Sequence, residues 1–510
     1  MPVKAAKHEN VQHISMVLSG GLNYAKAAAN IDDNELKRAM NFIYDPMTDT
    51  LITRPGTTCQ TTTALGSPIL RGYYYEKSPI VGYHVCASGG FLYKVTGAAL
   101  DTYTSIGALT DSTTVPSFLT FNNKLLIADG GTRIRTWDGT TYGTIATSPP
   151  ATALSMIKNR VIANASDELD SVYFSAPNDA EGASAWDTAV TAIGLKAGYG
   201  DSLTVNAFAV LGDDLIVSKV GDKEKRTYRV NVASATASEW YVQDLSQNNA
   251  AQSAQTIISA WNNVFFVDTN GFKSIKGTDT YGDLQVDPVG RKISTIFQQN
   301  YDSDSISYIP AYNAIWFNIG GRVFCYTERP DQETGQMISA FTDLLFTWDR
   351  CTSVYQAGDD VFLTGWDGLL HKLDDSISTD ETTPGVTANY TSAVRTKTFS
   401  FFVDGILRKL QWYLNPKSAG TGLIYACTED ETKTLLKTVT ITAEGEYLYD
   451  STGDLEAADD ELYDTGSSSW IETSRNRIRD QKMAFELVLT SGRCGIQWCK
   501  AEIAILEGGE

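Results

Sequence analysis

Two blocks of opposite charge lie close together near the C-terminal end of the chain. An acidic run over 454–464 holds six carboxylates, and four basic residues follow between 475 and 482. Such blocks can pair within one domain or between neighbouring copies of an assembly, where they set register more than affinity. The alternative is a solvated loop. We predict inter-subunit charge contacts from six residues: Asp459, Asp460, Glu461, Arg475, Arg477 and Arg479.

The types and spacing of the titratable residues favour no catalytic site. His8 and His13 lie in an N-terminal segment, whereas His84 and His371 lie in predicted strands, where a histidine is usually a core or edge position. Carboxylate pairs are always available among 61 acidic residues, so their presence does not distinguish a glycosidase from a protein without activity. No phosphate-binding glycine loop or nucleophile elbow precedes a helix. We predict no enzyme, no metal site and no cofactor.

Two further polar features are interpreted as turns. The segments 268–271 and 302–304 offer oxygen ligands but lack the twelve-residue calcium loop with its closing glutamate. The best basic cluster spans 223–229, and at hairpin spacing it fits a solvated turn better than a phosphate track.

Charge and cysteine content bound the class of protein. The net charge of −20 disfavours tight nucleic-acid binding, although DNA can slide past such a surface; acidity for solubility alone is the alternative. The seven cysteines are scattered, without a CxxC pair, which favours reduced thiols and synthesis in a reducing cytosol. No apolar run approaches the ~20 residues of a membrane helix, and we expect no signal peptide and no membrane insertion.

Short strands with marked turns organise the middle of the chain. Residues 117–145 read as four antiparallel strands, because Asn-Asn, Gly-Gly and Asp-Gly pairs suit tight hairpin turns. The unit recurs at spacings of 36 to 54 residues, near the roughly 40 to 50 of propeller repeats. A lone sheet of this size buries neither face, so neighbours must stack around a ring. The pattern predicts an all-β fold with a β-propeller of about six to eight blades, seven being the count of candidate repeats.

The remaining segments complete the predicted domain organisation. Residues 1–65 form an N-terminal arm and a propeller-closing strand, with a short helix over 33–40. The propeller spans 66–375, with inserted loops at about 176–206 and 277–304, the second containing a helix over 291–299. A polar linker at 376–390 precedes a C-terminal β-sandwich over 391–510.

Several segments resemble structural proteins of tailed bacteriophages. The chain opens with GGLN at 20–23, DNE at 33–35, Asn41-Phe42 and Arg54-Pro55-Gly56. Residues 314–328, 346–348, 358–375 and 475–506 continue the likeness, and the last is similar to the final strands of tail nozzle, or hub, proteins of short-tailed phages. The resemblance implies a propeller-bearing protein assembled as a ring, usually a hexamer, below the portal and adaptor.

We therefore predict a structural virion protein, made in the host cytoplasm, that encloses the channel for genome ejection. Its expected partners are itself, the portal-adaptor proteins, a tail fibre or spike, and double-stranded DNA that passes without specific binding. Two alternatives stay open. One is a propeller that binds a receptor or glycan, for which the recurring tryptophans would be stacking platforms; the other is a propeller glycosidase or lyase.

Overall fold

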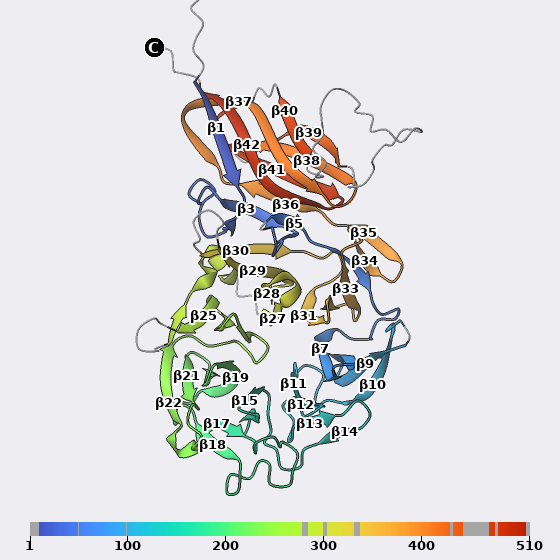
Figure 1. The fold of residues 1–510 in the computed structure, drawn as a ribbon, viewed down its shortest axis with the longest axis vertical. Helices are drawn as coiled ribbons and strands as arrows, with labels where there is room; N and C mark the ends of the chain where they lie inside the picture. The colour runs from blue at the N-terminus through green and yellow to red at the C-terminus, as the bar shows by residue number, and fades with distance from the viewer. Residues whose placement is uncertain are drawn as a thin grey trace, which may run out of the picture.

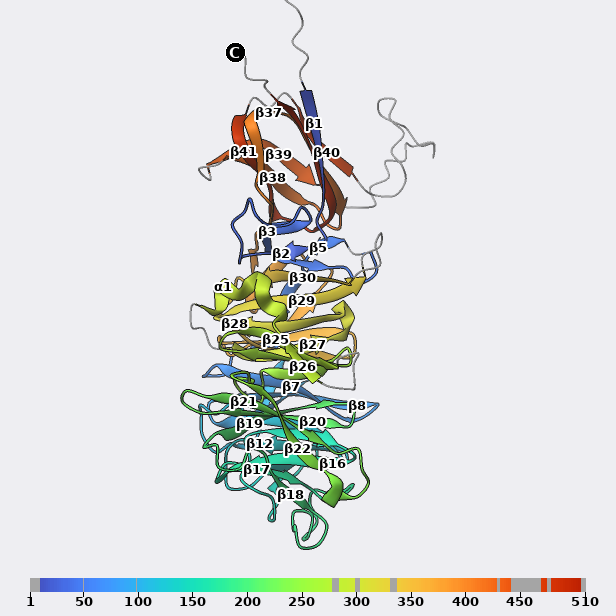
Figure 2. The ribbon, with the colours of Figure 1, turned by 90° about the vertical axis from the view of Figure 1, so that its left-hand side faces the viewer.

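The chain forms a ring of small sheets with a second β domain beside it (Figures 1 and 2). In this computed structural model the described residues are 10–48, 50–97, 99–277, 284–298, 303–330, 337–428, 432–441, 469–474 and 478–505. Regular structure in them is nearly all strand. The described helices are short: η1 (Ala237–Glu239), η2 (Val289–Ile293), α1 (Ser294–Phe297) and η3 (Pro310–Tyr312). In these residues we find no helix with the length and apolar character needed to cross a membrane.

Five blades are separate four-stranded antiparallel sheets. In chain order their strands are β7 (Ile69–Ser78), β8 (Val81–Ser88), β9 (Phe91–Thr96) and β10 (Thr102–Ala108); β11 (Ser117–Phe121), β12 (Lys124–Ala128), β13 (Arg135–Trp137) and β14 (Tyr142–Thr144); β15 (Leu154–Ile157), β16 (Arg160–Ala165), β17 (Glu168–Phe174) and β18 (Ile193–Lys196); β19 (Thr204–Leu211), β20 (Asp214–Val220), β21 (Lys225–Asn231) and β22 (Tyr241–Gln247); and β23 (Ile257–Ala260), β24 (Asn263–Asp268), β25 (Gly271–Gly277) and β26 (Leu284–Asp287).

Two more blades bring the described total to seven. The sixth is β27 (Ser303–Ile309), β28 (Ala314–Ile319), β29 (Arg322–Pro330) and β30 (Met337–Leu344). The seventh is β31 (Cys351–Ala357), β32 (Asp360–Gly365) and β33 (Leu370–Asp374), to which β6 (Gly56–Cys59) adds the fourth strand. The first strands of successive blades contact one another all the way round, from β7 to β31 and back to β7. The predicted all-β propeller fold is therefore confirmed, with the ring closed by a strand from the N-terminal segment.

Tight turns connect the strands for the reason the sequence suggests. Asn122 and Asn123 join β11 to β12 with φ values of 48° and 58°, and Gly320 and Gly321 join β28 to β29 with 56° and 82°. A two-residue hairpin turn with positive φ at both positions matches the twist of the strands, and asparagine and glycine adopt it at low cost.

The second domain packs two sheet layers around one apolar core. Its strands are β1 (Asn10–Val17), β2 (Gly21–Leu22), β3 (Glu35–Met40), β4 (Phe42–Tyr44), β5 (Leu51–Thr53), β36 (Ser392–Thr396), β37 (Phe399–Pro416), β38 (Gly420–Cys427), β39 (Lys433–Ile441), β40 (Ser469–Ser474), β41 (Arg479–Ser491) and β42 (Cys494–Ile505). Trp412 of β37, Phe485 of β41 and Cys499 of β42 are fully buried between the layers. The predicted sandwich is thus present, and strands from both ends of the chain build it.

The N-terminal segment differs from its prediction. Residues 33–40 were expected to form a short helix, but 35–40 form β3, which pairs with β36 on one side and with β30 of the sixth blade at Met40. Tertiary pairing overrides the weak one-sided helical pattern here, because β3 lies between two sheets that both need a neighbour. The segment before residue 54 is therefore part of the second domain and not a separate arm.

The predicted linker also carries regular structure. Residues 379–389 form a hairpin of β34 (Thr379–Thr383) and β35 (Val386–Asn389), and β34 extends the seventh blade by pairing in parallel with β6. The closing strand is β6, whereas β5, which precedes Arg54-Pro55, pairs with β4 and β42. Propeller and sandwich consequently meet along a continuous set of strands.

Both inserted loops contain residues that pack against the blades. The first contains β18, and its Trp186 is buried against the second and third blades. The second contains β26 and the short helices η2 and α1, whose Ile293 and Phe297 join the main core. The predicted helix over 291–299 is thus present in shorter form, covering the side of the fifth and sixth blades in Figure 2.

Candidate functional site

The axis of the propeller holds two cavities lined by first strands of the blades. The two cavities are lined by different parts of these strands. One cavity, of about 380 Å³, is lined by residues at the strand starts, such as Leu70, Thr152 and Thr352. The other, of about 550 Å³, is lined by later residues, such as Tyr73, Tyr308 and Gln356.

Gln255 separates the two cavities, because it lines both. It belongs to the segment leading into β23, and its side-chain amide donates hydrogen bonds across the ring to the carbonyls of Val115 (2.9 Å) and Pro116 (3.2 Å). The Gln255 carbonyl in turn accepts from the Ile306 amide at 2.9 Å. The Gln255 side chain therefore spans the axial channel at the level between the two cavities, which we call the waist.

The smaller cavity, which we call the upper cavity, combines amides with an exposed ring. Trp366 lies in the turn after β32 and is 43% exposed. Asn206 donates to the carbonyls of Ala251 (2.9 Å) and Gln252 (3.0 Å), while its buried Oδ1 has no hydrogen-bond partner among the described residues. An exposed indole and an amide that line the same cavity are groups that can bind a hydroxylated ligand.

The larger, lower cavity has one charged residue in its lining. Arg71 lies early in β7, near the waist, and no acidic residue lines the same cavity. Its Nη1 lies 3.5 Å from the carbonyl of Pro116, and its guanidinium lies 5.8 Å from the ring of Phe118. Burial lowers the pKa of Arg71 to about 10.

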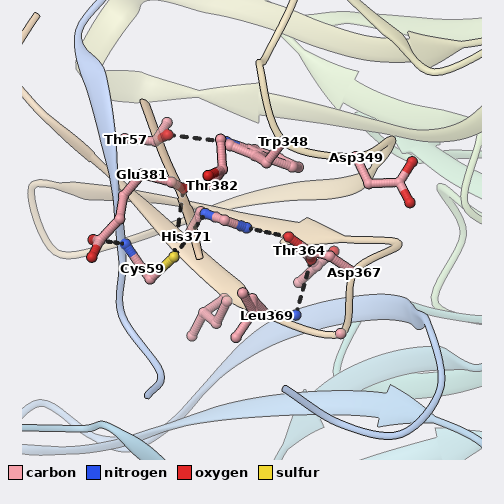
Figure 3. Close-up of polar contacts among 12 residues, drawn as sticks. Thr57, Cys59, Trp348, Asp349, Thr364, Asp367, Leu369, His371, Glu381 and Thr382 are labelled. Carbon is pink, nitrogen blue, oxygen red and sulfur yellow. Dashed lines mark hydrogen bonds and ion pairs between the residues drawn. The ribbon is translucent and has the colours of Figure 1, made fainter. Parts of the chain in front are cut away.

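A cysteine, a histidine and an aspartate meet where the ring closes (Figure 3). Cys59 Sγ of β6 lies 3.8 Å from His371 Nδ1 of β33, and His371 Nε2 lies 2.9 Å from Asp367 Oδ2. The order of groups is that of a nucleophile, a base and an orienting carboxylate. Cys59 and His371 are 312 residues apart, and no sequence spacing signalled their contact.

The surroundings of these three residues indicate a structural role. Burial, followed by the charges of Glu381 and Asp367, raises the pKa of Cys59 to about 12, so the thiol stays protonated at neutral pH and is a poor nucleophile. The fully buried His371 ring stacks on Trp348, with centroids 4.0 Å apart and planes at 4°. The cluster therefore fastens β6 to β33, and His371 is the satisfied core position that the sequence suggested.

The junction between propeller and sandwich is built around Arg54 and Asp380. Arg54 binds both Asp380 oxygens, at 2.7 and 2.6 Å, and both side chains are fully buried. Its three other N–H groups donate to Asn41 Oδ1 (3.1 Å), the Pro55 carbonyl (2.9 Å) and the Leu345 carbonyl (2.9 Å). All five donors are thus used. The guanidinium also lies 4.5 Å and 3.8 Å from the ring centroids of Phe346 and Tyr390.

A second polar cluster joins the opening motif to the fifth and sixth blades. Asn23 donates to Glu35 Oε2 at 2.7 Å, and Lys292 Nζ lies 3.2 Å from Glu35 Oε1. Burial raises the pKa of Glu35, but hydrogen bonds from the Asp32 amide and Asn23, with the Lys292 charge, lower it overall. Glu35 is therefore held as a carboxylate. The residues that carry the phage resemblance, Asn23, Glu35, Asn41 and Arg54, gather at this junction.

The predicted inter-subunit contacts are represented by Arg479 alone. Arg479 Nε lies 2.6 Å from Asp404 Oδ2, an exposed ion pair within the same chain. The other five, Asp459, Asp460, Glu461, Arg475 and Arg477, lie outside the described residues. The structure therefore does not place the acidic block relative to the basic one.

The other polar features have intramolecular partners. In the basic cluster, Lys225 binds Asp268 at 2.6 Å and Arg229 binds Asp214 at 2.8 Å. Asp268 also binds Lys273 at 2.6 Å, so its carboxylate pairs with two ammonium groups. No group of three or more potential metal ligands occurs in the described part of the chain.

Comparisons with known proteins assign no family to the chain. No protein-family description and no curated protein matches the sequence. Among solved structures, "YCF48 bound to D1 peptide" is similar over 63% of this chain and 97% of its own (TM-score 0.39, 11% identity). The WD40 propeller domain of Doa1 covers 62% and 97% (0.40, 11%), and BamB from Moraxella catarrhalis covers 64% and 92% (0.38, 11%). The strand pairing and the closed ring of blades show that the chain is a β-propeller protein.

Proposed function

We propose that this chain is a structural protein of a bacteriophage tail, a nozzle or hub subunit that forms a ring with copies of itself. The ring, a hexamer in this proposal, encloses the channel through which the genome leaves the virion. The portal-adaptor proteins above it and a tail fibre or spike beside it complete the proposed set of partners. The role requires shape and rigidity, and we infer that the chain is not an enzyme.

The observation that carries the proposal is the continuity between propeller and sandwich. One sheet runs from the sixth blade through β3 into β36 and β41, and one apolar core contains Phe272 of the fifth blade together with Trp412 of the sandwich. The fully satisfied Arg54–Asp380 pair lies at the same junction. Because a subunit of this kind cannot bend easily at its centre, it is suited to act as a fixed wedge in a ring.

The narrow axis of the propeller supports a channel between subunits and not through one of them. The lower cavity measures about 550 Å³, a size that suits a small ligand and cannot pass a duplex. Gln255 also bridges the axis. In the proposed assembly, DNA passes through the space that the copies enclose, and the net charge of −20 limits its adhesion to the wall.

Electron microscopy of the purified full chain tests the proposal. We expect closed rings of about six copies with a central lumen. Trimers would favour a receptor-binding appendage. Turnover of host polysaccharide by the pure protein would favour the glycosidase or lyase alternative.

A glycan-binding function is the second candidate, and the upper cavity favours it. Trp366 offers an exposed ring and Asn206 an unused acceptor in one cavity. If this candidate holds, Trp366→Ala abolishes binding to host-cell glycans while the fold is kept. Binding that is unchanged in this variant would remove the cavity from consideration.

A further inference from the structure

Arg71 is a cation without an anionic partner inside the lower cavity. Among the described residues, none forms an ion pair with it, and its hydrogen bond to the Pro116 carbonyl is long at 3.5 Å. A guanidinium has five N–H donors, so most of them are unused by the protein. Its lowered pKa agrees with this, because burial without a nearby carboxylate disfavours the charged form.

The walls around Arg71 mix aromatic and aliphatic side chains with hydroxyl and amide groups. The cavity is lined from every blade, and its aromatic and aliphatic members include Tyr73, Phe118, Leu154, Phe208, Ile306 and Tyr355. The serine hydroxyls of the lining are already engaged, since Ser305 and Ser307 donate to carbonyls of β31. A ligand therefore meets one largely free cationic fork near the waist and, below it, a wall of aromatic, aliphatic and polar groups.

We propose that the lower cavity binds a small organic carboxylate with a partly apolar body, with Arg71 clamping the carboxylate through its guanidinium fork. Planar two-point contact is the geometry that arginine and carboxylate share. The chemistry is that of a small organic acid or of the C-terminal residue of a peptide. This proposal is independent of ring formation, because every lining residue belongs to one copy.

The test uses the full-length protein and calorimetric titration with matched acid and amide probes. The probes are 3-phenylpropionate, the peptide acetyl-Ala-Leu-Phe with a free C-terminal carboxylate, the primary amides of both, and inorganic phosphate. We expect saturable binding of at least one acid and binding of its amide that is weaker by roughly tenfold or more, since hydrogen bonds to charged groups are the stronger class. Binding of the free acid alone assigns a metabolite-sized ligand, and binding of the peptide acid assigns a chain terminus.

Two variants assign the effect to Arg71. Arg71→Gln should bind acid and amide equally weakly. Arg133→Gln removes a guanidinium that only binds the Ser148 carbonyl on the second blade, and it should behave as wild type. Three results would each overturn the proposal: no saturable binding of either acid, equal affinity of wild type for acid and amide, or phosphate binding as tight as that of the acids. The acid-to-amide ratio of wild type needs no variant, so it decides the matter even if Arg71→Gln fails to fold.

Discussion

Arg54 is fully buried and Arg71 is half-buried, and their surroundings are opposite. Arg54 uses all five N–H donors, pairs with Asp380 through two oxygens and lies between two rings. Arg71 has one long hydrogen bond to a carbonyl and borders a cavity of about 550 Å³. Burying a charge is costly unless it is paired and hydrogen-bonded, so only Arg54 is compensated by the fold itself.

The two arginines therefore have different roles: Arg54 stabilises the fold, whereas Arg71 is available to bind a ligand. The junction is saturated, and its residues have no capacity left for a ligand. The axial channel keeps polar groups unused, Arg71 below Gln255 and the Asn206 acceptor above it. Removing a saturated group should therefore cost stability, whereas removing an unsaturated one should cost ligand binding.

The largest effect is expected for Arg54→Met. The substitution leaves the Asp380 carboxylate buried without its partner, and such losses cost about 3–5 kcal/mol. Denaturant unfolding of the variant measures the change. The double variant Arg54→Met/Asp380→Leu should recover part of the loss because no charge stays buried. A loss below about 1 kcal/mol in the single variant would show that the junction does not depend on this pair.

Acid titration extends the comparison to a third buried base, His84. This residue packs on Phe362 of the seventh blade, with ring centroids 4.4 Å apart, and burial lowers its pKa to about 4. In the unfolded chain the His84 side chain binds a proton near pH 6.5, whereas in the folded chain it does so only near pH 4. The contribution of neutral His84 to the free energy of unfolding is therefore fully present above pH 6.5. It is lost as the pH falls towards 4, by up to about 3 kcal/mol.

The His84→Phe variant isolates this contribution. Between neutral pH and about pH 4.5 its unfolding free energy should fall by about 2 kcal/mol less than that of wild type. Denaturant curves at the two pH values give both numbers. The same pH dependence in variant and wild type would mean that other groups govern acid sensitivity.

Gly56→Ala tests how closely the junction is packed. A Cβ at this position would lie 2.2 Å from the Thr379 carbonyl oxygen, which is backbone of β34 and cannot rotate away. We expect a loss of about 1–3 kcal/mol, measured as a lower thermal midpoint. Gly66→Ala is the matched control, because nothing lies within 4 Å of its added Cβ. Equal midpoints for the two variants would argue against tight packing around β6.

Arg71→Gln should have the smallest effect on stability. Its desolvated charge has no partner to lose, so the unfolding free energy should change by less than about 1 kcal/mol in either direction. The same denaturant experiment as for Arg54→Met provides the comparison. A loss of unfolding free energy as large as that of Arg54→Met would show that Arg71 also stabilises the fold. The contrast between the two residues would then not hold.

The sequence predicts the repeated part of the fold well because each blade is local. Turn pairs such as Asn122-Asn123 lie beside the strands they join, and apolar runs mark the strands. It predicts the non-local parts poorly. Residues 35–40 form a strand because of partners more than 300 residues away, and β34 pairs with β6 across a similar distance. Local propensity carries no record of such partners.

The candidate site shows the same limit. Arg71 sits in a strand pattern like any surface arginine, and only the closed ring places it in a cavity. Cys59, Asp367 and His371 meet only because β6 returns to the seventh blade. The Arg54-Pro55-Gly56 motif belongs to the phage resemblance, yet Asp380, the partner of Arg54, lies in the predicted linker at 376–390.

The mass of the assembly formed by the purified full chain tests the central claim most directly. Native mass spectrometry over a range of concentrations should give a species of about six times the 55.6 kDa subunit. A discrete trimer, or a monomer at every concentration, would contradict a ring-forming wedge.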